Sequence, residues 1–281
     1  MTHISELINF GSKSLKEKLI SSHRLDSELI LSNVLKKSRE NMLISLDKNI
    51  SEESVFIFNK LLKRRIKREP IAYIFKEKEF WSNKFFINSD ALIPRPETEL
   101  LVEKTLKHFK GKKPFILDAG TGSGCILLSF LKENKDSKGI GIDISRKALY
   151  VARKNSRDFN LTSRSKFYNK CISQIYNYRF DLIISNPPYI TSSEMNNLSE
   201  DIRRYEPRIA LEGGNDGLDV IKKVIYKSTS ILKKKGMLAL EVGNGQYRKV
   251  LKILKLNNFR NRFLIKDYQD NVRCIISTLK D

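Results

Sequence analysis

The sequence predicts an α/β protein, with a doubly wound, mostly parallel sheet that follows a small helical domain. From Lys113 onward, short apolar segments typical of strands alternate with segments of helical periodicity. That alternation is typical of parallel sheets covered by helices. Residues 1–75 show helical periodicity alone, and no internal repeat or low-complexity linker interrupts either part.

The first part of the chain is expected to be a bundle of helices. In the segment LDSELILSNVL, apolar residues recur at helical spacing and predict one buried stripe: Leu25, Leu29, Ile30, Val34 and Leu35. A further helix is predicted to begin after Ser51, a candidate N-cap, and to be closed by Pro70. Residues 73–92 alternate and are rich in aromatic residues, which indicates a hairpin or an extended connector. We therefore expect a helical domain at 1–75, a linker at 76–93 and the larger domain at 94–281.

The larger domain is predicted to begin with a proline-rich turn and a helix from about Glu97. Further helices are expected at 145–155 and 217–232. The segments expected to form strands are 114–119, 139–142, 180–185, 237–242, 263–266 and 273–277. Each is short and apolar, as buried strands of a parallel sheet are.

The composition favours a cytoplasmic protein. With 281 residues and 40% hydrophobic residues, the chain can build a large core. No apolar run approaches the ~20 residues that span a bilayer, and the N-terminus does not resemble a signal peptide. Three widely spaced cysteines fit neither a disulfide framework nor a zinc pattern, so we expect a reducing compartment and no metal.

The net charge of +21 leaves two interpretations open. The densest basic cluster is KLLKRRIKRE, which begins at Lys60 and includes Arg64, Arg65 and Arg68. Such a cluster can be a solvated helix face, or it can contact an anionic partner. Because lysines are spread along the whole chain, the charge can also reflect nucleotide composition, and we expect no direct nucleic-acid substrate.

A glycine-rich turn in FILDAGTGSGC predicts a cofactor site. Cys125 stands where a dinucleotide fingerprint has its third glycine, and no P-loop lysine follows. Asp118, before the turn, suits a cationic amino group, and Asp143 ends the next strand at a spacing typical of ribose binding. A ligand with a ribose and an ammonium group but no phosphate is S-adenosylmethionine. The residues of the turn are Gly120, Thr121, Gly122, Ser123 and Gly124.

The stretch SNPPYI places a rigid corner at the end of a predicted strand, where ligands of α/β sheets bind. The side-chain oxygen of Asn186 and the carbonyl of Pro187 can accept the two hydrogens of a planar NH₂ group. Pro188 helps to fix the backbone, and Tyr189 offers an aromatic wall. We therefore predict methyl transfer to a planar amine or amide nitrogen, with alignment as the main requirement.

Several stretches resemble one family. EPIAYIFKEKEFW (69–81), LIPRPETELLVE (92–103), LDAGTGSGCI (117–126) and EPRIALEGGNDGLDV (206–220), together with NPPY, are similar to the release factor glutamine methyltransferases, the PrmC or HemK family. The resemblance covers nearly the whole chain. It implies a class I, Rossmann-like methyltransferase fold with a seven-stranded sheet and an N-terminal helical domain. It also implies methylation, by S-adenosylmethionine, of the glutamine in the Gly-Gly-Gln motif of class-I peptide chain release factors.

The resemblance also implies roles for individual residues. The turn from Gly120 to Gly124 and Asp143 would bind the cofactor, and Asn186 to Tyr189 would hold the glutamine amide beside it. Cys171 would lie near the adenine, although Lys170 and Cys171 differ from the acidic and bulky residues usual there. Arg95 is either a residue of the pocket rim or part of a structural linker. The EGGNDGLD segment either borders the substrate channel or caps a helix.

One alternative shares the NPPY chemistry, an adenine-N6 methyltransferase acting on DNA or RNA. Such an enzyme flips its target base and needs a sizeable element that recognises nucleic acid. No target-recognition domain is evident after the catalytic part of this sequence. We therefore rank the release factor first as partner, and we expect the protein to be a monomer.

Overall fold

The structure is a computed structural model that describes residues 2–280. It divides into two compact units. Unit 1 comprises the chain up to Lys76 together with Ser199–Tyr205, and unit 2 comprises Glu77–Leu198 and the chain from Glu206 onward. The predicted linker at 76–93 thus groups almost entirely with unit 2. The short segment from the second half of the chain that groups with unit 1 was not predicted.

Unit 1 is built from helices around one apolar core. Its elements are β1 (Thr2–His3), α1 (Ile4–Glu17), α2 (His23–Leu35), α3 (Arg39–Leu43), β2 (Asn49–Ile50), α4 (Glu52–Ile66), α5 (Ile71–Phe75) and α9 (Glu200–Tyr205). Ser51 caps α4 as predicted, and its hydroxyl accepts a hydrogen bond from the Ser54 amide. Pro70 does not end α4 but precedes α5, because α4 already stops at Ile66.

The buried face of α2 differs from the predicted stripe. Leu25 is 45% exposed, whereas Asp26 and Glu28 are buried. Both carboxylates are ion-paired: Asp26 with Arg65, and Glu28 with Arg24 and Arg39. Buried carboxylates require such partners, and apolar periodicity gives no sign of them.

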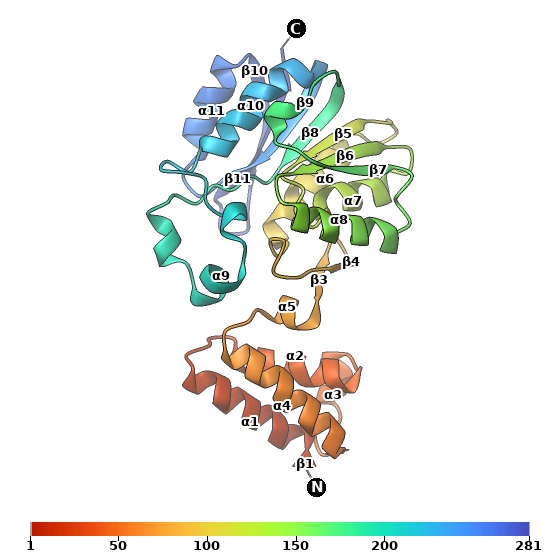
Figure 1. The fold of residues 1–281 in the computed structure, drawn as a ribbon, viewed down its shortest axis with the longest axis vertical. Helices are drawn as coiled ribbons and strands as arrows, with labels where there is room; N and C mark the ends of the chain where they lie inside the picture. The colour runs from red at the N-terminus through yellow and green to blue at the C-terminus, as the bar shows by residue number, and fades with distance from the viewer. Residues whose placement is uncertain (1, 281) are drawn as a thin grey trace. The chain divides into compact units, whose positions relative to one another are not determined.

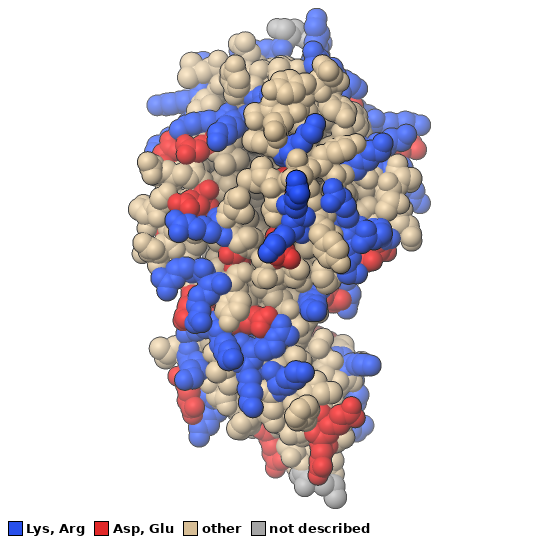
Figure 2. Space-filling view, viewed as in Figure 1, with Lys and Arg blue, Asp and Glu red and all other residues tan. Residues whose placement is uncertain are grey.

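The arginines of the basic cluster, Arg64, Arg65 and Arg68, are ion-paired within unit 1. Arg65 is buried and holds Asp26 and Asp201 at 2.7 Å each. The other pairs are Arg64 with Glu69, and Arg68 with Glu200 and Asp201. The exposed cations of the cluster are lysines: Lys60, Lys63 and Lys67. Figure 2 shows lysine and arginine side chains spread over the visible face rather than gathered on one element.

Unit 2 contains a seven-stranded sheet with the order β10-β11-β9-β8-β5-β6-β7. Neighbouring strands from β9 to β7 pair in parallel, and β11 is antiparallel to both of its neighbours. The strands are β5 (Phe115–Ala119), β6 (Lys138–Asp143), β7 (Ser165–Asn169), β8 (Phe180–Ser185), β9 (Leu232–Glu241), β10 (Phe259–Lys266) and β11 (Val272–Leu279). A separate hairpin joins β3 (Glu77–Phe80) to β4 (Asn83–Phe86), as the alternation predicted.

Helices cover both faces of this sheet (Figure 1). On one face lie α6 (Glu99–His108), α7 (Cys125–Glu133) and α8 (Arg146–Asp158), and on the other lie α10 (Asp219–Ile231) and α11 (Tyr247–Leu256). Short 3-10 helices are η1 (Pro96–Thr98), η2 (Ile172–Gln174), η3 (Glu194–Asn197) and η4 (Arg208–Ala210). Successive residues of β8 alternate between the two cores, Leu182 and Ile184 in one and Ile183 in the other. The sheet is therefore buried on both faces, as parallel sheets are.

All six predicted strands are present. The strand β7 was not predicted, because its sequence SKFYN is mostly polar and only two of its five residues are buried. Within residues 2–280, no helix is long and apolar enough to cross a membrane.

Candidate active site

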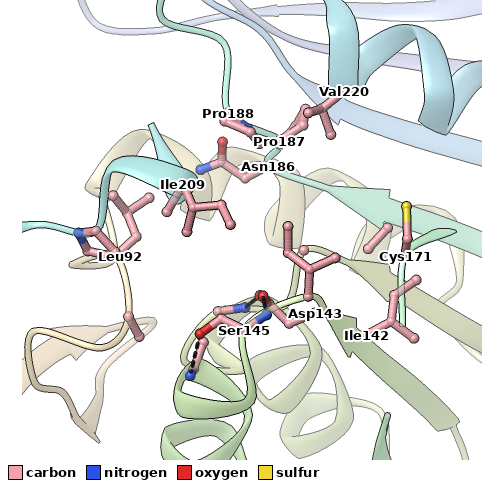
Figure 3. A pocket seen from close by; sticks show the side chains of 18 of the residues that line it. Leu92, Ile142, Asp143, Ser145, Cys171, Asn186, Pro187, Pro188, Ile209 and Val220 are labelled. Carbon is pink, nitrogen blue, oxygen red and sulfur yellow. Dashed lines mark hydrogen bonds between the residues drawn. The ribbon is translucent and has the colours of Figure 1, made fainter. Parts of the chain in front are cut away.

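The carboxyl ends of β5, β6 and β8 border a cavity of about 590 Å³ within unit 2. Small-molecule sites usually enclose about 300–1,000 Å³. Figure 3 shows Asn186 and the two prolines across this cavity from Asp143 and Ser145. Leu92 and Ile209 lie on one side of it. The cavity thus joins the predicted glycine turn to the predicted NPPY corner.

The glycine turn after β5 has backbone angles that favour glycine. Gly120, Gly122 and Gly124 have φ of 77°, 54° and 81°, which side chains with a Cβ rarely adopt. A Cβ at Gly120 or Gly122 would meet no atom within 4 Å, and both residues line the cavity. The turn therefore leaves its backbone open to a ligand, as predicted.

Asp143, at the end of β6, lines the cavity and also holds the glycine turn. Its Oδ2 accepts a hydrogen bond from the Gly122 amide at 3.0 Å, and its Oδ1 accepts one from the Ser145 amide at 2.8 Å. Burial raises the pKa of this carboxyl, and the backbone donors oppose that shift. Each oxygen retains a lone pair that can accept from a ribose hydroxyl.

Asp118, which precedes the turn, and Thr121 and Ser123 within it are buried, and their side chains do not line the cavity. Asp118 is fully buried, and its Oδ2 accepts a hydrogen bond from the Thr121 hydroxyl at 2.7 Å. Its Oδ1 has no hydrogen-bond partner among the described residues. Burial raises the pKa of this carboxyl to about 7. The predicted contact of these three side chains with the cofactor stays a prediction.

The NPPY corner follows β8, which pairs with β5. Its backbone is held by the loop that contains EGGNDGLD, because the Ile190 amide donates to the Leu211 carbonyl and the Gly213 amide donates to the Ile190 carbonyl. A second support is Gln246, whose Nε2 donates to the Tyr189 carbonyl at 2.8 Å. The glycine segment therefore fixes the corner, a role that neither prediction for it included.

Hydrogen bonds link the side chains of the corner to a buried carboxylate. Asn186 donates from Nδ2 to the Thr98 hydroxyl at 3.1 Å, and Thr98 donates to Oε2 of Glu241 at 2.6 Å. The Tyr189 hydroxyl donates to Oε1 of Glu241 at 3.3 Å. Burial raises the pKa of Glu241 to about 7 and also raises that of Tyr189. Asn186 lines the cavity, and no hydrogen bond from a described residue ends at its Oδ1.

Sequence reasoning missed Thr98 and Glu241, although one signal was present. Glu241 ends an apolar strand, β9, as Asp118 and Asp143 lie at the ends of β5 and β6. Acids in that position meet at one edge of a parallel sheet. Thr98 gives no such signal, because its role depends on a contact 143 residues away in the sequence.

The remaining predicted residues divide into two groups. Lys170 and Cys171 line the cavity, as do Pro187 and Pro188. Tyr189 points to Glu241 and is outside the cavity lining, and Arg95 is also outside it. Arg95 forms an ion pair at 2.6 Å with Glu206, whose side chain is 1% exposed. Glu206 also accepts from the Ile93 amide, so Glu206 fixes the segment from Ile93 to Arg95, which follows the cavity residue Leu92.

The residues of the site fit S-adenosylmethionine. The open backbone at Gly120 and Gly122 admits a ligand, Asp143 offers acceptors for hydroxyl groups, and Asp118 carries an unpaired buried oxygen close to the turn. The walls add apolar surface from Leu92, Ile142, Pro188, Ile209 and Val220. Apolar walls with few polar groups are usual for such ligands.

Residues 6–75 match the family PrmC N-terminal domain, and residues 96–205 match the family Methyltransferase small domain. The release factor glutamine methyltransferase of Buchnera aphidicola subsp. Baizongia pistaciae is 38% identical over 97% of this chain and 98% of its own length. That of Rhodospirillum rubrum is 35% identical over 98% of this chain and 84% of its own. A bifunctional methyltransferase of Rickettsia typhi is 34% identical over 97% of this chain, which spans 56% of it.

Solved structures share the fold. A methyltransferase from Pyrococcus furiosus superposes with a TM-score of 0.55 at 16% identity, covering 79% of this chain and all of its own. The tRNA m1G37 methyltransferase of M. jannaschii gives 0.52 at 13% identity, covering 73% of this chain and 56% of its own. The predicted α/β fold, a class I methyltransferase domain with a seven-stranded sheet, is confirmed.

Proposed function

The chain belongs to the release factor glutamine methyltransferase family, and from that premise we propose that it methylates class-I peptide chain release factors. The acceptor is N5 of the glutamine in their Gly-Gly-Gln motif, and the donor is S-adenosyl-L-methionine. The observation that carries the proposal is the Asn186 amide oxygen, which is left without a donor beside a cavity bordered by the glycine turn.

The cofactor is held by the glycine turn and by Asp143. Gly120 and Gly122 let it approach the backbone, and Asp143 accepts from its ribose hydroxyls. Cys171 and Ile142 contribute the wall on the side away from Leu92 (Figure 3). When bound, S-adenosylmethionine supplies an activated methyl group.

Asn186 and Pro187 bind and orient the glutamine amide. The side-chain oxygen of Asn186 and the carbonyl of Pro187 accept its two N–H hydrogens, which leaves the nitrogen lone pair directed at the cofactor side of the cavity. An amide nitrogen is a poor nucleophile because its lone pair is delocalised. Accepting both hydrogens returns electron density to nitrogen, and alignment of this kind can lower a barrier by ~7–11 kcal/mol in favourable cases.

The surroundings of the corner keep this geometry fixed. The prolines limit the backbone, and the loop around Gly213 together with Gln246 binds it from outside. Leu92 and Ile209 form apolar walls for the glutamine stem. The alkylated amide is acidic enough to lose its proton late, so these residues need no strong base among them.

Adenine-N6 methylation, the alternative that shares the NPPY chemistry, is not favoured, because relatives that match nearly the whole chain over most of their own length are release factor glutamine methyltransferases. We further propose that the protein is a cytoplasmic monomer without a nucleic-acid substrate. Its three cysteines are free thiols, which suits a reducing compartment. Exposed apolar residues on the helices of unit 2 lie on separate helices: Tyr150 on α8, Tyr226 on α10 and Leu256 on α11.

The test is transfer of labelled methyl from S-adenosylmethionine to a purified class-I release factor. Label should enter the factor, should be lost when the glutamine of its Gly-Gly-Gln motif is replaced by alanine, and should not enter duplex DNA. Asn186→Ala should lower the rate by about 100-fold or more while cofactor affinity stays close to wild type. Asn196→Ala, at an exposed site outside the cavity, is the matched control. Label on DNA alone, or full activity of Asn186→Ala, would contradict the assignment.

A further inference from the structure

The hydrogen bonds between Asn186 and Glu241 have a direction. The Thr98 hydroxyl lies between them, 3.1 Å from Asn186 Nδ2 and 2.6 Å from Glu241 Oε2. A hydroxyl has one hydrogen to donate. If that hydrogen goes to Glu241, the hydroxyl oxygen can only accept from Asn186, so the NH₂ group of Asn186 must face Thr98.

The same arrangement decides which end of the Asn186 amide faces the cavity. With its NH₂ group at Thr98, Asn186 presents its carbonyl oxygen to the site. If Thr98 donated to Asn186 instead, the amide would turn over and present its NH₂ group. An NH₂ group cannot accept the N–H of a glutamine amide, and one of the two holding hydrogen bonds would be lost.

We propose that Glu241, acting through Thr98, is the positioning residue that sets the orientation of the Asn186 amide for substrate binding. This rests on the proposed function, in which Asn186 accepts from the substrate. Glu241 is 1% exposed and Thr98 is 2% exposed, and neither lines the cavity. They can therefore act on the substrate only through other side chains. These are Asn186, which hydrogen-bonds Thr98, and Tyr189, which hydrogen-bonds Glu241.

The second branch ties the other end of the corner to the same carboxylate. Tyr189 donates from its hydroxyl to Oε1 of Glu241 at 3.3 Å. Both Glu241 oxygens are thus used as acceptors, one for each end of the NPPY corner. A carboxylate is the side chain that can only accept at both oxygens, which is why an acid suits this buried position.

Protonation would remove that property. A protonated Glu241 can donate to Thr98, and Thr98 can then donate to Asn186, which reverses the chain. The ionisable groups that act on Glu241 are Tyr189 after β8, Glu97 on η1 and Arg273 on β11, with Cys125 and Cys274 themselves within its field. Burial is the largest influence and raises the pKa of Glu241 to about 7, while Thr98, Tyr189 and Arg273 lower it. We call the hydrogen bonds from Asn186 through Thr98 to Glu241 the relay. As pH rises through neutrality, Glu241 ionises, and a larger fraction of the protein should hold the Asn186 amide in the orientation that binds substrate.

Three variants test the relay in the full chain, with the purified release factor as substrate. Thr98→Val removes the hydroxyl at nearly constant volume and should lower kcat/KM by about 10- to 100-fold, because a hydrogen-bonding site without its partner loses that much. Thr98→Ser keeps the hydroxyl and should restore most of the activity. Glu241→Gln can donate to Thr98 and should lower kcat/KM by a similar factor of about 10 to 100. Cofactor affinity, measured by calorimetry, should stay close to wild type in all three.

The pH profile separates positioning from a purely structural role. Between about pH 6 and 8, the wild-type kcat/KM should rise, whereas Glu241→Gln should be lower and nearly flat. The double variant Thr98→Val, Glu241→Gln should have a kcat/KM no lower than that of the weaker single variant. Both substitutions act on the same Asn186 amide, so their losses should not add. If Glu241→Gln does not fold, the kcat/KM of Thr98→Val compared with that of Thr98→Ser tests the relay instead.

Full activity of Thr98→Val, no rescue by Thr98→Ser, or additive losses in the double variant would each overturn the relay. These outcomes differ from a failure of the proposed function. If the wild-type protein did not methylate the release factor, the function and the relay would fall together. If the wild-type protein methylated the release factor and Thr98→Val kept full activity, the relay would fail while the proposed function stood.

Discussion

At the scale of single residues, Asp118 was predicted to contact the cofactor, and in the structure its carboxylate accepts a hydrogen bond from Thr121 of the glycine turn. The sequence correctly placed an acid at the end of a buried strand, next to the glycine turn. The structure buries that acid completely, beneath Thr121 and away from the cavity lining. The sequence could not reveal this depth, because burial depends on how α7 packs over the strand. An orphaned carboxylate oxygen in such a place makes the ionised form costly.

The first prediction follows from the raised pKa of Asp118, about 7 in the folded protein against about 3.9 in an unfolded chain. Between these values the native state binds more protons than the unfolded state, so stability falls as pH rises. Lowering the pH from about 7.5 to about 5 should therefore raise the free energy of unfolding by roughly 2 kcal/mol more in wild type than in Asp118→Asn.

Urea unfolding at several pH values measures this difference. Glu241 has a raised pKa as well, but it is present in both proteins and cancels in the comparison. Asp136→Asn, at an exposed carboxylate, is the control and should follow wild type within ~0.5 kcal/mol. Equal pH dependence in wild type and Asp118→Asn would show that burial of Asp118 carries no such cost.

At the scale of elements, the sequence predicted the strand β8, its end point and the rigid corner after it, because prolines and apolar runs are local signals. It did not predict what holds the corner. The EGGNDGLD segment begins more than twenty residues later, and its contacts arise only when the loop closes. Gly217 shows how tight they are, since a Cβ there would lie 2.3 Å from the Tyr189 carbonyl oxygen and 2.5 Å from Nε2 of Gln246.

The second prediction compares two glycines with similar backbone angles. Gly217 has φ of 70° and Gly111 has φ of 72°, but a Cβ at Gly111 would meet no atom within 4 Å. Alanine should cost about 1 kcal/mol of stability at either position, because of the left-handed conformation. Only Gly217→Ala must also displace the Tyr189 carbonyl, so only this variant should lose methyl transfer, by about 10-fold or more.

Thermal unfolding and the labelled-methyl assay, run on both alanine variants, separate strain from displacement. A loss of activity in Gly111→Ala that matched the loss in Gly217→Ala would point to general destabilisation instead. Retained activity in Gly217→Ala would mean that the loop yields and does not hold the corner.

At the scale of the whole molecule, the chain builds unit 1 from two distant parts of its sequence. The segment Ser199–Tyr205 groups with the helices of the first 76 residues, while the residues on either side of it belong to unit 2. Periodicity predicted helices in both units. It did not predict that Ser199–Tyr205 groups with unit 1, because α9 is short and polar. The signal was in the charges: acids at Glu200 and Asp201, and arginines in the cluster on α4.

The last prediction concerns Arg65, which joins these two parts of unit 1. Its buried guanidinium holds Asp26, 39 residues earlier, and Asp201, 136 residues later. Arg65→Met keeps much of the volume but leaves the buried Asp26 without its ion-pair partner, and leaves Asp201 with Arg68 alone at 3.6 Å. Removing one member of a buried ion pair costs about 3–5 kcal/mol. Lys63→Met, at an exposed position on the same helix, should change stability by no more than ~0.5 kcal/mol.

Urea unfolding followed by circular dichroism reports the helices of both units, and fluorescence of Trp81, the single tryptophan, reports unit 2. For Arg65→Met we expect the dichroism transition to move to lower urea, because the helices of unit 1 lose stability. Any loss of release factor binding should accompany that shift, since this arginine is not a surface contact. If binding weakened while the transition stayed at the wild-type midpoint, Arg65 would have to contact the partner after all.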